Sequence, residues 1–86
     1  MMMTHKTLKY VRQTINHPYI GIKILPLVGD FCGHATNVTK SLYDEDELTS
    51  EEYGKMMEMI FQIERHQNET ALHELLLIFK HYAGWV

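Results

Sequence analysis

The sequence predicts an all-α fold, a small bundle of about four helices, on three observations. In four segments the apolar residues recur every three or four positions, the spacing of one helical face. Threonine or asparagine residues suited to helix capping precede three of these segments. Only residues 19–25 show the two-residue period of a strand, and a lone strand has nothing to pair with. We therefore expect a single all-α domain over residues 1–86.

The first helix is expected over residues 5–16. Leu8, Val11 and Ile15 form its apolar side, and either Thr4 or Thr7 can cap its start. The stretch 16–18, Asn-His-Pro, ends it because proline cannot continue a helix.

Residues 19–25 are the least regular part of the chain. Ile20, Ile22 and Ile24 alternate with other residues, but a strand here would need a second subunit to pair with. A buried connector or a short helical turn is the favoured alternative.

The second helix is expected over residues 26–43, with Pro26 in its first position, where the missing N–H is not needed. Gly29 and Gly33 lie one turn apart and suggest a close helix crossing or a kink. The apolar stripe of this helix is Leu27, Phe31, Ala35, Val38 and Leu42.

The last two helices, over residues 50–66 and 69–83, are expected to form a C-terminal helical hairpin. An exposed acidic link, residues 44–47, precedes them, and Thr49 with Glu52 makes a capping box. A break capped by Asn68 is favoured over one continuous helix, and Gly84 is placed to end the second.

Composition restricts the class of protein. Net charge −3, 45% apolar residues and 22% charged residues are typical of a folded domain. Cys32 is the only cysteine, which excludes an internal disulfide and suits a reducing compartment. We find no signal-peptide pattern and no apolar run of membrane-spanning length, so a cytoplasmic protein without membrane contact is expected.

Two groups of residues resemble metal sites only in part. Asp30, Cys32 and His34 would share one face of a strand, but the expected helix turns Cys32 away from the other two. Histidines and a carboxylate also lie near the last break, without a known metalloenzyme spacing, at His66, Glu69 and His73. Phosphate-binding loops and catalytic motifs are missing from the sequence, so we expect no enzyme activity, no cofactor and no metal.

The last helix predicts a contact surface. Residues 75–79 are five consecutive apolar residues, and a helix turns through more than a full circle over that length, so they cannot all face one neighbour. A core helix is the alternative, but a chain this short has a small interior. We therefore expect contact between copies of the chain through Leu77, Ile78, Phe79, Tyr82 and Trp85.

The expected function is a small non-enzymatic protein-binding module, accessory or inhibitory, acting as a homodimer or higher oligomer on a protein partner. A short chain without catalytic motifs is similar in kind to such proteins encoded by phages, a likeness of size and composition alone. Charge supports an alternative, because residues 1–43 hold five basic and one acidic residue, net +4, whereas residues 44–86 hold three basic and ten acidic, net −7. The acidic half disfavours nucleic acid, but a small anion such as a nucleotide could bind Lys6, Lys9, Tyr10, Arg12 and Lys23.

Overall fold

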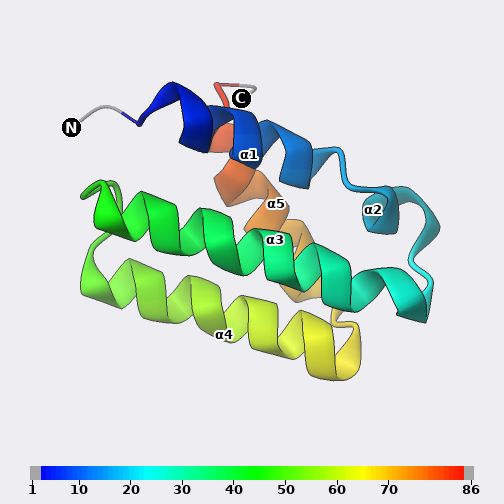
Figure 1. The fold of residues 1–86 in the computed structure, drawn as a ribbon. Coiled ribbons are helices and arrows are strands. Elements are labelled where there is room, and N and C mark those ends of the chain that lie inside the picture. Colours follow the sequence, from blue (N-terminus) through cyan, green and yellow to red (C-terminus); the bar gives the residue numbers. More distant parts are fainter. Residues whose placement is uncertain (1–2, 85–86) are drawn as a thin grey trace.

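The computed structural model describes residues 3–84 and contains four long helices and one short helix (Figure 1). No strand occurs within those residues, so the predicted all-α class is confirmed. The predicted bounds of the four long helices agree with the observed ones to within one residue. The helices are α1 (His5–Ile15), α2 (Pro18–Ile22), α3 (Leu25–Asp44), α4 (Ser50–His66) and α5 (Glu69–Tyr82).

The four long helices enclose one core. Helix α3 packs against α1 and α4, and α5 closes the bundle because it also packs against α4 and α1. Figure 1 shows α3 and α4 running side by side in opposite directions, with α5 crossing behind them and α1 above. The short helix α2 packs on the first turns of α3 at one end of the bundle.

The interior is apolar and closely packed. All four long helices contribute residues that are buried to 4% exposure or less. The accessible surface of 5391 Å² is close to the ~5300 Å² that a folded monomer of this mass exposes. The chain therefore buries an ordinary share of its surface without a partner. The largest fully buried side chains include Phe31, Phe79, Leu42, Met56, Ile63 and Leu75.

The helix ends follow the capping signals of the sequence. Thr4 accepts a hydrogen bond from the backbone N–H of Thr7, and Asn68 caps α5. The predicted capping box is present, since Thr49 Oγ1 accepts from Glu52 N at 3.1 Å and Glu52 Oε1 accepts from Thr49 N at 2.8 Å. The hydrogen bond from the Thr49 backbone N–H, with a further contribution from the Thr49 side chain, lowers the pKa of the Glu52 carboxyl. The predicted break between the last two helices is confirmed.

Residues 18–22 form a helical turn, which decides among the three alternatives left open by the sequence. His17 Nδ1 accepts the backbone N–H of Tyr19 at 3.1 Å and so caps this turn. Lys23 ends it in the left-handed conformation, with φ 57°.

The glycines of α3 do not mark a close helix crossing. A Cβ atom added at Gly29 or Gly33 would meet no atom within 4 Å, so nothing approaches α3 at these positions. The helix also begins one residue earlier than predicted, at Leu25, which puts Pro26 in the second position. Proline is tolerated in the second position of a helix for the same reason as in the first. The backbone N–H groups of both positions have no acceptor within the helix, so the missing N–H of proline costs no hydrogen bond.

The acidic link between α3 and α4 is less exposed than the sequence suggested. Glu45 is half-buried and accepts hydrogen bonds from Thr4 N at 2.9 Å and from the Thr7 hydroxyl. Burial alone would raise the pKa of Glu45, but the hydrogen bonds from Thr7 and Thr4 outweigh it and lower the pKa. Tyr82 of α5 donates its hydroxyl to the carbonyl oxygen of Glu47 at 2.9 Å. The link between α3 and α4 therefore forms hydrogen bonds with both the start of α1 and the end of α5.

None of the helices in residues 3–84 has both the length and the apolar character needed to cross a bilayer.

Candidate functional site

The surface predicted on α5 is mostly internal. Phe79 is fully buried in the core, so the expectation that it contacts another copy is wrong for this fold. Ile78 and Tyr82 are half-buried, and Leu77 is 48% exposed but stands alone on the outer face of the helix. Trp85 lies outside the described residues. The contacts of α5 with both α1 and α4 hide most of the consecutive apolar residues within the chain itself.

A larger exposed apolar surface lies at the turn between α2 and α3. Ile22, Ile24 and Leu25 are 63%, 48% and 66% exposed, and we call this group the α2–α3 tip. At its edge Lys23 Nζ lies 2.9 Å from the Glu69 carboxylate at the start of α5. The tip contains the largest exposed aliphatic fractions among the described residues.

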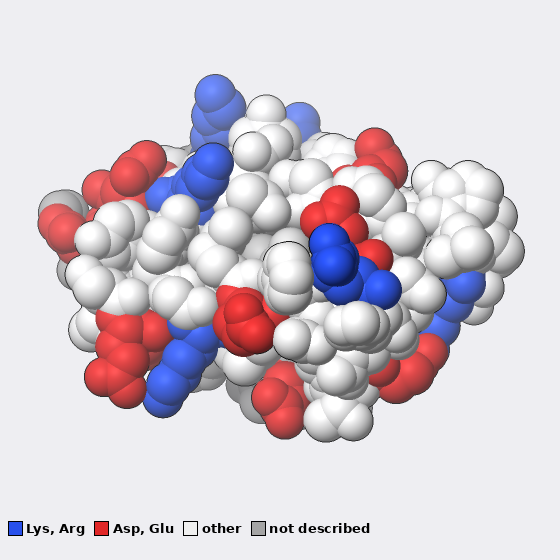
Figure 2. Space-filling view, turned by 90° about the horizontal axis from the view of Figure 1, so that it is seen from below, with Lys and Arg blue, Asp and Glu red and all other residues white. Residues whose placement is uncertain are grey.

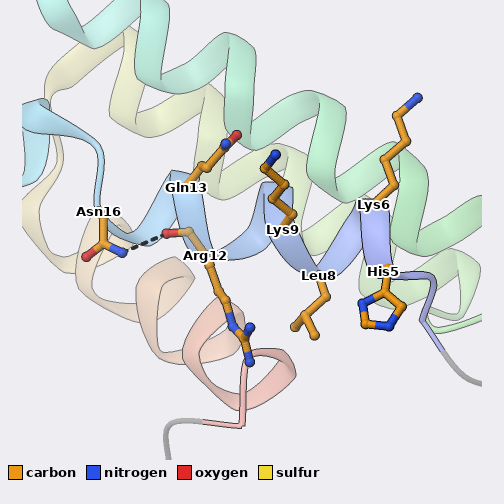
Figure 3. A pocket seen from close by; sticks show the side chains of 7 residues that line it. All are labelled: His5, Lys6, Leu8, Lys9, Arg12, Gln13 and Asn16. Carbon is orange, nitrogen blue, oxygen red and sulfur yellow. Dashed lines mark hydrogen bonds between the residues drawn. The ribbon is translucent and has the colours of Figure 1, made fainter.

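The predicted anion-binding residues do not converge. Figure 3 shows Lys6 and Lys9 on the side of α1 toward α3, whereas Arg12 points toward the end of α5. Among the described residues, those that border the hollow beside these side chains all belong to α1 or its C-cap Asn16, so they form an open helix face. Lys23 lies in the α2–α3 turn, where it pairs with Glu69. The set predicted from sequence therefore does not form one site.

Two of those residues belong instead to a cleft between α1 and α3. Lys6 and Tyr10 line one wall, and side chains of α3 line the other, around a volume of about 460 Å³. We call this the α1–α3 cleft. Its α3 wall is made of His34, Asn37, Lys40 and Ser41.

A cluster of two histidines and one carboxylate lies at the α2 end of the bundle. His17 Nε2 is 2.6 Å and His34 Nε2 is 3.6 Å from the same oxygen, Oδ2 of Asp30. Candidate ligand atoms of all three residues lie within 4.8 Å of one another, close enough for one divalent cation. His17 is buried and packs its edge against Phe31, whereas Asp30 and His34 are exposed.

The hydrogen bonds of His17 oppose a metal at that position. Because Nδ1 accepts the Tyr19 N–H, a neutral imidazole carries its proton on Nε2, which donates to Asp30. A metal on Nε2 would displace that proton and place a ring N–H against the Tyr19 N–H. The hydrogen bond from His17 lowers the pKa of the Asp30 carboxyl, so the carboxylate is the favoured acceptor. His17 therefore links α2 to α3 through its hydrogen bonds to Tyr19 N and to Asp30, and we call this pair of bonds the His17 clamp.

The metal groupings considered from sequence are not formed. Cys32 points into the core toward the Ile60 carbonyl, 3.8 Å away, and not toward Asp30. His66 and Glu69 stand on either side of the break between α4 and α5, and the only candidate metal group within residues 3–84 is the one containing His17.

Cys32 is expected to be inert while the chain is folded. Burial raises the pKa of its thiol to about 11, and Glu64 adds to the shift. At pH ~8 its thiolate fraction is then about 100-fold below that of an exposed cysteine. We predict labelling by a thiol reagent at least ~100-fold slower in buffer than in denaturant. A comparable rate in both would mean that Cys32 is accessible.

Sequence reasoning missed His17, Lys40 and the exposure of the α2–α3 tip. Asp30 and His34 are one helical turn apart, so a contact between their side chains could have been predicted from the sequence. His17 precedes a proline, where a capping side chain is common, and that signal was available too. Only the packing of α1 on α3 brings Lys40 beside Lys6.

No family model, no curated protein and no solved structure matches the chain in the comparisons made.

Proposed function

We propose that this chain is a small non-enzymatic protein-binding module that acts as a homo-oligomer, in an accessory or inhibitory role. The observation that carries the proposal is the α2–α3 tip. Three large aliphatic side chains within four consecutive residues are about half exposed or more. Single exposed apolar residues are ordinary, but a contiguous group marks a contact surface more often than chance.

The tip is not needed to complete the core. Helix α2 is held by Tyr19, which is buried against the ring of Phe31 at a centroid distance of 5.5 Å, and by the His17 clamp. Ile22 and Leu25 point away from those contacts, as their exposure shows. Polar residues at these two positions would therefore cost the monomer little, which supports a role in association.

We take a second copy of the chain as the occupant of the tip. Lys23 and Glu69, which pair within one copy at the edge of the tip, have opposite charges, so a two-fold contact that brought these edges together would place complementary charges opposite each other. Three side chains cover less than the ~800 Å² per partner of a standard interface. Residues next to the tip must therefore add to the buried area, and we expect the association to be weak.

The charged surfaces outside the tip are the proposed contact with the protein partner. Figure 2 shows acidic and basic side chains interleaved over one face of the molecule. Such a face favours recognition through complementary charge, which fixes orientation and partner choice.

Sedimentation velocity over a range of concentrations tests the proposal. We expect the double variant Ile22→Gln/Leu25→Gln to raise the dissociation constant of the dimer at least ~10-fold, because each copy loses buried apolar area. Leu77→Gln is the matched control, since it makes the same change at another exposed leucine, and it should leave association unchanged. Circular dichroism should show the same helix content in all variants. Stronger weakening by Leu77→Gln would move the contact to α5 and refute the assignment of the tip.

A further inference from the structure

The α1–α3 cleft combines positive charge with unused hydrogen-bond donors. Lys6 and Lys40 approach it from different helices, and within residues 3–84 neither forms an ion pair. The ion pairs found among the described residues use His17, His34, Lys23 and Lys55 as their basic partners. Two ammonium groups on opposite walls, without carboxylates between them, favour an anion in the space they share.

The neutral groups of the cleft are also free to bind. The side chains of Tyr10, Asn37 and Ser41 make no hydrogen bond to any other described residue. Each offers a donor, and together with the two lysines they could surround a tetrahedral oxyanion. Spacing supports this arrangement, since Lys6 and Tyr10 are one turn apart on α1 and Asn37 and Ser41 are one turn apart on α3.

Two carboxylates that neighbour residues of the cleft, Asp30 and Glu45, are already engaged. Asp30 contacts His34 at 3.6 Å, but it accepts its shorter hydrogen bond from His17 at 2.6 Å. Glu45 is held by Thr4 and Thr7, which lie on either side of Lys6 in the sequence at the start of α1. Among residues 3–84 no carboxylate lines the cleft itself, so none of the described side chains around it repels an incoming anion directly.

We propose that the α1–α3 cleft binds a small phosphoryl-bearing anion, with Lys6 and Lys40 as the charged contacts. The volume of about 460 Å³ is within the ~300–1,000 Å³ range of small-molecule sites and would admit a nucleotide. Polymeric nucleic acid is a poorer fit, because a long polyanion would also meet the acidic α4 and α5 half. This inference is independent of the tip, which lies on other residues.

Titration of the isotopically labelled protein by NMR tests the site at low ionic strength, with inorganic phosphate, pyrophosphate and ADP as separate probes. We expect saturable shifts of the backbone amides of Tyr10, His34, Asn37 and Ser41. Lys6→Gln and Lys40→Gln should each raise the dissociation constant about 10-fold, since each removes one charge-assisted contact.

Lys9→Gln is the matched control, because Lys9 is exposed on the same helix but does not line the cleft. Lys9→Gln should change the dissociation constant less than about threefold, because the charge of Lys9 acts on the bound anion only at a distance and is screened by salt. An equal loss in Lys9→Gln, or no saturable shift with any probe at ~10 mM, would overturn the proposal.

The three probes separate the possible sources of the phosphoryl group. Equal binding of phosphate and ADP would identify the phosphoryl group alone as the ligand. Tighter binding of ADP that is lost in Tyr10→Ala but kept in Tyr10→Phe would identify a nucleotide stacked on the Tyr10 ring.

Discussion

Phe79→Ala is expected to lower the free energy of unfolding by about 3–5 kcal/mol, the usual cost of removing a buried aromatic side chain. Phe79 is 0% exposed and belongs to α5, which packs on both α1 and α4. The cavity would therefore open inside the core of the bundle. Urea unfolding followed by circular dichroism gives the change directly.

Leu77→Ala is the control on the same helix. Because Leu77 is 48% exposed, its truncation should change the free energy of unfolding by less than ~1 kcal/mol. If Phe79→Ala left stability near that of the control and weakened self-association instead, Phe79 would belong to an interface and the packing of α5 would be wrong.

Phe31→Ala is expected to cost a similar ~3–5 kcal/mol and to loosen α2 as well. The rings of His17 and Tyr19 both rest against Phe31, at centroid distances of 5.6 Å and 5.5 Å. Without that ring the clamp and the buried tyrosine lose their support. Hydrogen exchange at the Lys23 amide, which donates to the Tyr19 carbonyl at 2.7 Å, reports the change locally.

Leu42→Ala separates the local effect from the global one. Leu42 is also fully buried in α3, but it lies near the opposite end of that helix. We expect it to reduce stability without selectively speeding exchange at Lys23. Equal acceleration in both variants would show that α2 opens only when the whole domain unfolds.

The helices were predictable because their signals are local. The Thr49 and Glu52 capping box and the Asn68 cap depend on residues within one turn of each other, so the sequence contains the whole pattern. Residues 19–25 were harder, because alternating isoleucines match a strand. The hydrogen bond from Tyr19 N to His17 and the support of Phe31 favour the helical turn.

The candidate sites were less predictable because they depend on how the helices pack. Consecutive apolar residues showed that α5 could not face one neighbour, but not that α1 and α4 cover most of them and leave Leu77 alone. Lys6 and Lys40 are far apart in sequence and meet only because α1 crosses α3. Which apolar or basic face stays exposed is a tertiary property that a helical period does not contain.

Sedimentation equilibrium of the unmodified chain tests the central claim most directly. If the α2–α3 tip joins two copies, the apparent mass should rise with concentration from 10.1 kDa toward twice that value, and high salt should not abolish the rise. A constant 10.1 kDa at every concentration would contradict self-association through the tip.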